Sequence, residues 1–198
     1  MPSILVLFYS QSGSTRLLAE KIAYGAQLEN CDVKLRTVPN VSSNTQQSEA
    51  DVPDSGAPYV TLEDLKQCDA IALGSPTRFG NMAAPMKHFW DSTSSLWLRG
   101  DLVDKPACVF TASASMHGGQ ETTLLSMMIP LLHHGMVICG LPYSVPELAT
   151  TKTGGTPYGV SHVSFNAEVP QLTEEEIALS IAQGKRLATM ARNHTNSR

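Results

Sequence analysis

The class of fold is decided by ILVLFYSQSGST, residues 4–15, which joins an apolar run to a loop rich in hydroxyl side chains. Residues 4–7 are apolar without interruption, which is typical of a strand buried on both faces of a parallel sheet. After the loop, Leu18, Ile22 and Ala26 recur at every fourth position and give a helix one apolar stripe. A strand, a short loop and a helix in this order predict an α/β protein.

The same alternation continues along the chain. Short apolar runs rich in Val, Ile and Leu predict five parallel strands, at residues 4–9, 33–38, 70–74, 107–111 and 136–139. The last helix begins at a capping box formed by Thr173 and Glu176, and Ile177, Ile181 and Ala188 are predicted to form its buried face. Strands that alternate with helices predict an open, doubly wound sheet with helices on both faces.

The length of 198 residues fits a single domain over residues 1–198. Two segments interrupt the rhythm of strands and helices. Residues 41–58 are polar and rich in Ser, Asp and Pro, which indicates a long exposed loop. Residues 142–170 contain GGTPYG at 154–159, which predicts consecutive turns within a loop insertion.

The charge balance limits the classes of partner. Fourteen basic and 18 acidic residues give a net charge of −4, which argues against nucleic-acid binding and against a polybasic membrane anchor. Residues 122–146 carry no formal charge, but Pro130 and Pro142 interrupt them, so no membrane span is expected. The first residues lack the basic region of a signal peptide, which predicts a cytoplasmic protein whose partners are small molecules or copies of itself.

Four cysteines lie far apart and form no C-x-x-C pair. This spacing indicates neither a zinc site nor a redox-active pair, and no metal is expected. Free cysteine is among the most buried residue types, so we expect reduced, packed thiols.

Three unusual loops follow the predicted first, third and fourth strands: SQSGST at residues 10–15, SPTRFGNM at 75–82 and ASASMHGGQ at 112–120. In an open parallel sheet, ligands bind outside the carboxyl ends of the strands where the strand order reverses. With the strand order 2-1-3-4-5, these three strands are neighbours. The three loops are therefore predicted to form one site.

The first loop has the composition of a monophosphate site. It lacks the lysine of a nucleoside-triphosphate loop and the glycine spacing of a dinucleotide fingerprint. The hydroxyls of Ser10, Ser12, Ser14 and Thr15, together with amides at the helix start, can hold one terminal phosphate, with Gly13 allowing close approach. The alternative is an ordinary helix cap, because Ser and Thr are common there.

At this point the sequence resembles a known family. FYSQSGST at residues 8–15 resembles the flavodoxin signature for the FMN phosphate, and PTRFGNM at residues 76–82 is similar to the sequence typical of the WrbA family of FMN-dependent NAD(P)H:quinone oxidoreductases. Further agreement lies in SSLW ending at Trp97, GGQE at 118–121, HHGM at 133–136 and GGTPYG. The resemblance covers nearly the whole chain and implies a flavodoxin-like fold with FMN as the cofactor.

The resemblance also implies a role for each loop. The first loop would hold the phosphate, Arg78 would be a fixed and catalytic cation near the flavin ring, Phe79 would pack beside the ring, and the third loop would bond its polar edge. The implied cofactor-binding residues are Ser10, Gln11, Ser12, Gly13, Ser14, Thr15, Pro76, Thr77, Arg78, Phe79, Ser113, Ala114, Ser115, Met116, His117, Gly118 and His133.

Two further residues would complete the pocket in front of the flavin. Trp97 would form its substrate wall, and His133 would face the ring and act catalytically by giving a proton to the reduced quinone or polarising its carbonyl. Members of the family are tetramers whose pockets take walls from neighbouring chains, so a homotetramer is expected in which both residues can act on another subunit's flavin. Taken alone, His133 could instead cap the end of a helix before Gly135.

The function implied is two-electron reduction of quinones by NADH or NADPH through bound FMN. Donor and acceptor would use the same open face in turn, which predicts ping-pong kinetics. Two alternatives stay open: a flavodoxin-like one-electron carrier, and a flavin-binding interaction protein without enzyme activity. The mild net charge does not favour the carrier, since such carriers are usually strongly acidic around the flavin.

Overall fold

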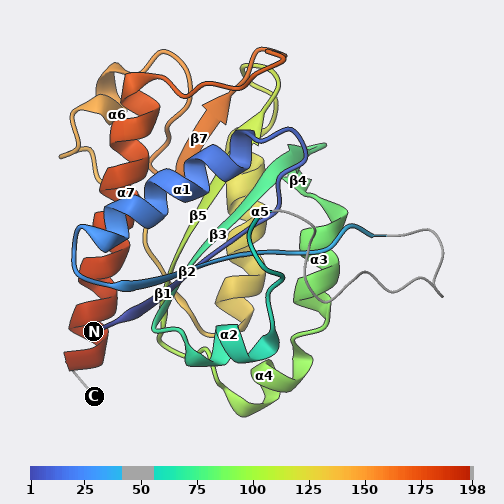
Figure 1. Cartoon of the computed structure of the whole chain (residues 1–198), viewed down its shortest axis with the longest axis vertical. Helices are drawn as coiled ribbons and strands as arrows, with labels where there is room; N and C mark the ends of the chain where they lie inside the picture. Colours follow the sequence, from blue (N-terminus) through green and yellow to red (C-terminus); the bar gives the residue numbers. More distant parts are fainter. Residues whose placement is uncertain (42–55, 197–198) are drawn as a thin grey trace.

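A parallel sheet lies between two layers of helices in the computed structural model, which describes residues 1–41 and 56–196 (Figure 1). The strand order is β2-β1-β3-β5-β6, and every neighbouring pair along it is parallel. This confirms the predicted flavodoxin-like topology, since these are the second, first, third, fourth and fifth strands of the prediction. The strands are β1 (Ser3–Phe8), β2 (Asp32–Thr37), β3 (Ala70–Arg78), β5 (Pro106–Ser113) and β6 (Val137–Ile138).

Side chains that alternate along each strand form two separate cores. In β1, Ile4, Val6 and Phe8 join one core, while Leu5 and Leu7 join the other. Because both faces are covered, the strand is apolar throughout, which explains its sequence. The first core is covered by α1 (Ser14–Gln27) and α7 (Glu174–Asn196); the second is covered by α2 (Leu62–Gln67), α3 (Ala84–Asp91), α4 (Ser94–Arg99) and α5 (Gln120–His133).

The edge of the sheet beside β5 is made by two short strands. β6 pairs with Pro106 and Ala107, and β7 (Val160–Val163) pairs with the carboxyl half of β5. The intervening chain holds α6 (Glu147–Thr150) and the predicted turn, closed by a bridge between Thr156 and Gly159. The sequence prediction missed β7, because four residues with the sequence VSHV carry too short an apolar signal.

The beginning of α7 agrees with the prediction, but its buried face does not. The capping box is present, with Thr173 Oγ1 accepting from the Glu176 amide at 3.2 Å and a Glu176 carboxylate oxygen accepting from the Thr173 amide at 3.0 Å. Ala188 is buried as expected, whereas Ile177 and Ile181 are only half-buried. The helix turns a partly polar face inward instead, and apolar periodicity cannot reveal such a face. Its buried residues are Glu176, Leu179, Ser180, Gln183, Gly184, Leu187, Ala188 and Ala191.

Two glycines allow α1 and α7 to approach closely. A Cβ added at Gly25 would lie 2.2 Å from the carbonyl oxygen of Ile181, and one added at Gly184 would lie 2.1 Å from that of Ile22. The apolar stripe predicted for α1, which includes Leu18, Ile22 and Ala26, is fully buried in this contact and against the sheet. The position of α1, and of the loop that leads into it, therefore depends on α7.

The four cysteines are buried and unbridged, as predicted: Cys31, Cys68, Cys108 and Cys139. Burial raises the pKa of Cys68 to about 12. Most of the predicted loop 41–58, namely residues 42–55, lies outside the described residues. Among the helices that the structure describes, none is long and apolar enough to cross a membrane.

Candidate functional site

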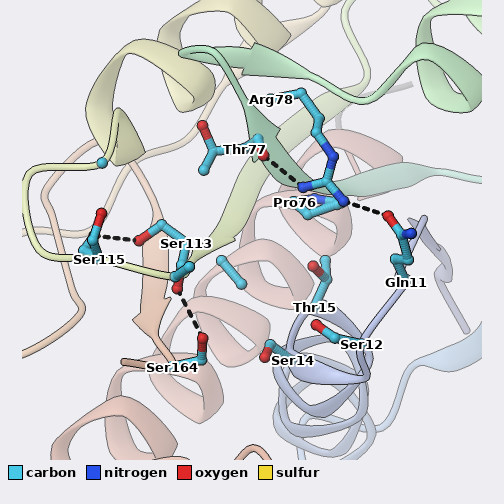
Figure 2. A pocket seen from close by; sticks show the side chains of 13 residues that line it. Gln11, Ser12, Ser14, Thr15, Pro76, Thr77, Arg78, Ser113, Ser115 and Ser164 are labelled. Carbon is cyan, nitrogen blue, oxygen red and sulfur yellow. Dashed lines mark hydrogen bonds between the residues drawn. The ribbon is translucent and has the colours of Figure 1, made fainter. Parts of the chain in front are cut away.

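The three predicted loops meet at the carboxyl edge of the sheet, where they line a pocket of about 260 Å³ (Figure 2). The loop after β1, the end of β3 and the loop after β5 each form part of its wall. The lining residues are Gln11, Ser12, Ser14, Thr15, Pro76, Thr77, Arg78, Ala112, Ser113, Ala114, Ser115, Gly118 and Ser164. We refer to this site as the edge pocket. Ala112 belongs to the predicted loop 112–120 but was not among the individual residues expected to bind the cofactor. Ser164 was not predicted, because it follows the missed strand β7.

The amino end of α1 forms one side of the edge pocket. Gly13, at φ 97°, is the N-cap residue of the helix and, lacking a side chain, cannot cap the first amides of the helix. Ser14 and Thr15 are only 5% and 1% exposed, and within the described part of the chain their hydroxyls form no hydrogen bond. Pocket-lining hydroxyls without a protein partner, next to the positive end of a helix, are suited to an anion.

Ser10 shapes this loop from the other side. Its Oγ accepts hydrogen bonds from the amides of Gly13 at 3.1 Å and Arg16 at 3.3 Å. Ser10 and Gly13 line a neighbouring pocket of about 300 Å³ rather than the edge pocket, and Gln11 borders both. Ser10 therefore fixes the shape of the loop that leads into α1.

Arg78 reaches across the edge pocket from the end of β3. Its guanidinium donates to Gln11 Oε1 at 2.5 Å and to the carbonyl of Thr77 at 2.8 Å, so the cation is held in place although it is exposed (Figure 2). The described lining contains no acidic side chain. Arg78 and the helix end therefore make the pocket electropositive.

The turn that follows Arg78 places an aromatic side chain in solvent. β3 pairs with β4 (Asn81–Met82) through a two-residue hairpin of Phe79 and Gly80, with φ values of 51° and 75°. Two positive φ values suit a tight hairpin turn, but they are uncommon for a bulky residue. Phe79 is fully exposed and does not line the edge pocket. Strained backbone conformations of this kind cluster at functional sites.

The loop after β5 is fixed by its own hydrogen bonds. The carbonyl of Ser115 accepts from Ser113 Oγ at 2.9 Å, from the Gly118 amide at 3.2 Å and from Gln120 Nε2 at 3.0 Å. Met116 and His117 project from this loop, are exposed, and lie outside the pocket lining. The wall formed by residues 113–118 is thus preformed.

Trp97 and His133 lie at the other end of the molecule. α5 begins next to the edge pocket and ends at His133, and its 14 residues span about 20 Å. The neighbouring His134 accepts or donates a 2.9 Å bond to Thr93, which precedes α4 and Trp97. Figure 1 shows α4 and the end of α5 opposite the loops that carry the edge pocket. Within one chain, neither residue reaches that pocket.

Comparison with known proteins gives evidence about the family that is independent of the geometry of the site. The model of the NADPH-dependent FMN reductase family matches residues 2–148. A protein from Geotalea daltonii named NAD(P)H dehydrogenase (quinone) is 42% identical over 196 residues, which cover 95% of this chain and 96% of that protein.

Solved structures share the fold. A WrbA-like flavodoxin from Agrobacterium tumefaciens superposes with a TM-score of 0.68 at 23% identity, covering 98% of this chain and 99% of that one. Oxidised flavodoxin 1 from Bacillus cereus gives a TM-score of 0.60 at 18% identity, covering 97% and 98%. With the family match over residues 2–148 and the close relative along nearly its whole length, the chain belongs to the NADPH-dependent FMN reductase family.

Proposed function

We propose that this chain is a WrbA-type NAD(P)H:quinone oxidoreductase that binds FMN in the edge pocket. The observation that carries the proposal is the pair Ser14 and Thr15, which line the pocket at the amino end of α1 and whose hydroxyls have no hydrogen-bond partner within the described residues, an arrangement that suits a phosphate monoester. The relative named NAD(P)H dehydrogenase (quinone) supports the reaction.

Different residues of the edge pocket would bind different parts of FMN. Ser12, Ser14 and Thr15 hydroxyls, with the first amides of α1, would hold the phosphate. The preformed loop of residues 113–118 would meet the polar edge of the flavin ring. Bound FMN would supply the hydride and electron chemistry, so the protein needs only to bind, orient and tune it.

Arg78 would contribute to the reaction through its positive charge. Its guanidinium is a cation, and the bond to Gln11 holds it at the pocket rim. A fixed cation there would stabilise negative charge that develops during reduction. Because the rim beside Arg78 and Phe79 is open to solvent, nicotinamide and quinone would reach the same side in turn, which predicts ping-pong kinetics.

A homotetramer is part of the proposal. α5 exposes three large apolar side chains one or two turns apart, Leu125, Ile129 and Leu132, at 45%, 57% and 58% exposure. Trp97, also half-exposed, lies on α4 near the same end of α5. Apolar patches of this kind mark interfaces. Association through this surface would let Trp97 and His133 serve a neighbouring chain's pocket. Ile129→Glu should lower the mass measured by light scattering, and an unchanged mass would refute this interface.

The reaction is tested by anaerobic stopped flow with FMN-loaded protein. Rapid loss of the flavin's visible absorbance on adding NADH or NADPH, and its return on adding benzoquinone, is the expected result. Binding without reduction would favour the one-electron carrier, and failure to bind FMN would refute both.

The role of Arg78 is tested by substitution. Arg78→Ala should weaken FMN retention or slow flavin reduction by about tenfold, which corresponds to ~1.4 kcal/mol. Arg99→Ala is the matched control, because Arg99 is also exposed but pairs with Asp101 near α4, at the end of the molecule opposite the edge pocket. Wild-type behaviour of Arg78→Ala in both measurements would contradict the assigned role.

A further inference from the structure

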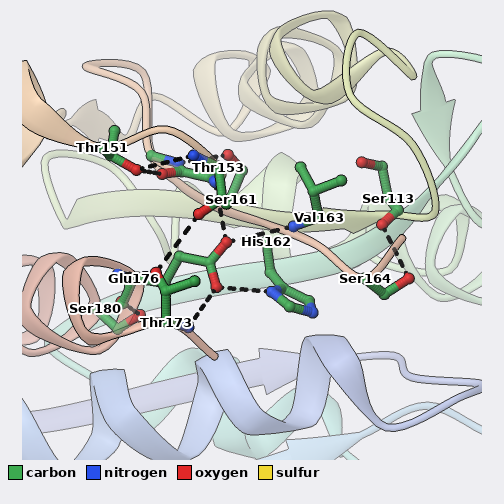
Figure 3. A network of polar contacts seen from close by, with 12 residues as sticks. Ser113, Thr151, Thr153, Ser161, His162, Val163, Ser164, Thr173, Glu176 and Ser180 are labelled. Atoms are coloured by element: carbon green, nitrogen blue, oxygen red, sulfur yellow. Dashed lines mark hydrogen bonds and ion pairs between the residues drawn. The ribbon is translucent and has the colours of Figure 1, made fainter. Parts of the chain in front are cut away.

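A buried carboxylate gathers four hydrogen bonds at the start of α7 (Figure 3). Glu176 has no exposed surface and accepts from His162 Nδ1 at 2.8 Å, from the Gly154 amide at 2.9 Å, from the Thr173 amide at 3.0 Å and from the Val163 amide at 3.4 Å. A capping box needs only the bond to Thr173. The other three donors belong to β7 and to the turn that precedes it.

The charge state of Glu176 follows from its contacts. Burial raises the pKa of Glu176, but hydrogen bonds from His162, Thr173 and Gly154 outweigh burial and lower it below its ordinary value. An ionised carboxylate only accepts hydrogen bonds, so His162 Nδ1 carries a proton and donates it. His162 is 2% exposed, and its Nε2 has no partner within the described residues. The ring is therefore held by Glu176 alone.

β7 is short and lies beside a gap between the two strands that pair with β5, so it depends on hydrogen bonds from α7 to hold it in place. β6 pairs with the first two residues of β5, and β7 begins opposite Phe110, so the residues of β5 between them lack a strand neighbour on that side. Gln183 of α7 fills the break: its Nε2 donates to the carbonyl of Val109 at 3.0 Å, and its Oε1 accepts from the Val160 amide at 2.8 Å. α7 thus holds β7 at both ends, through Gln183 and Glu176.

The carboxyl end of β7 leads directly into the edge pocket. Val163 is opposite Ser113 in the sheet, and Ser164 follows it. The carbonyl of Ser113 accepts from the Ser164 amide at 2.9 Å and from Ser164 Oγ at 3.3 Å. Ser113 and Ser164 both line the pocket. A shift of β7 would therefore move this wall.

We propose that Glu176, together with His162, is a positioning residue for the cofactor pocket: by fixing β7 it sets the wall formed by Ser113 and Ser164. The inference rests on the proposed function, in which this pocket receives FMN. Glu176 does not line the pocket and would act through β7.

The test compares Glu176→Gln with two controls. Gln keeps the size of the side chain but places an amide N–H₂ group opposite at least one backbone donor. Glu174→Gln is the charge-matched control, because Glu174 lies in the same first turn of α7 and is exposed. Leu187→Ala controls for stability, because Leu187 is a buried core residue of α7 that makes none of the hydrogen bonds to β7.

Two measurements are made on the full chain at a temperature where all variants are folded. The first is the Kd for FMN from quenching of flavin fluorescence, with the absorption spectrum of the bound flavin. The second is amide hydrogen exchange of residues 160–164 without FMN. We expect Glu176→Gln to raise the Kd about tenfold, shift the bound-flavin spectrum and speed exchange in β7, while both controls leave the spectrum and the exchange of β7 unchanged.

The outcomes separate the two proposals. If the wild type binds FMN and Glu176→Gln matches it in Kd, spectrum and exchange, the positioning role is refuted and the proposed function stands. An equal loss of affinity in Leu187→Ala without faster exchange in β7 would also refute the role, because general destabilisation would then explain it. If the wild type fails to bind FMN, the proposed function fails, and Glu176 is no longer a positioning residue for that cofactor.

Discussion

Gly184→Ala should destabilise the protein although alanine is the better helix former. In a helix interior, alanine is favoured over glycine by about 1 kcal/mol. Against this gain, the new methyl would lie 2.1 Å from the carbonyl oxygen of Ile22 and 2.9 Å from the amide nitrogen of Ala26. Both are backbone atoms of α1, so no side-chain rotation can relieve the clash, and α1 must move away from α7.

Overpacking of this kind costs about 1–3 kcal/mol, and a clash with backbone belongs at or above the upper end of that range. After subtracting the gain in helix propensity, we expect a loss of ~2 kcal/mol in the free energy of unfolding. For a chain of this length that loss lowers Tm by about 4–8 °C. Since α1 carries Ser14 and Thr15 at its amino end, weaker FMN binding should accompany the loss of stability.

Urea denaturation and calorimetry of the protein without FMN measure the stability change, and fluorescence titration measures the binding. Lys185→Ala is the control, because this neighbouring side chain is exposed and its replacement leaves the helix contact intact. A Gly184→Ala protein as stable as the wild type, or more stable, would refute the close approach of the two helices.

Three further predictions concern the phosphate site, pH and the thiols. Thr15→Ala should remove a hydrogen bond to a charged group, worth about 1.5–3 kcal/mol, and so weaken FMN binding at least tenfold while leaving riboflavin binding unchanged; equal effects on both flavins would contradict phosphate binding at this position. Burial raises the pKa of Glu176 and of Asp64, but hydrogen bonds lower it by more, so both pKa values lie below their ordinary values. Both carboxylates therefore stabilise the fold above their unfolded pKa values, and this stability is lost as the pH falls through their pKa values in the folded state. The free energy of unfolding should therefore fall below about pH 4.5, the ordinary value for Glu, and Glu176→Gln should make that fall shallower in urea titrations; an unchanged slope would argue against an ionised Glu176. Burial raises the pKa of Cys68 to about 12, so iodoacetamide should leave it unmodified at pH 8 in the native protein and modify it in urea; modification of the native protein detected by mass spectrometry would contradict its burial.

Parts of the site could be read from the sequence because they depend on neighbours along the chain. A strand followed by a hydroxyl-rich loop and an amphipathic helix places Ser12, Ser14 and Thr15 at a helix amino end in any parallel α/β fold. The strand order then brings this loop beside Arg78 and the loop after β5. The separation of Trp97 from the edge pocket could not be predicted from neighbours along the chain. The order of the motifs in the sequence does not reveal at which end of the sheet a helix lies.

The sequence by itself determined the alternation of strands and helices, the capping box of α7, the two-sided burial of the strands and the position of the hydroxyl-rich loop before α1, since each follows from local periodicity and backbone hydrogen bonding. Only the tertiary structure decided that β7 completes the edge of the sheet, that α7 turns Glu176 and Gln183 inward, and that Ser164 enters the pocket wall. These features depend on hydrogen bonds between segments distant in the chain. Such bonds allow polar side chains to be buried in the core, but they leave no signal in the pattern of apolar residues along the sequence.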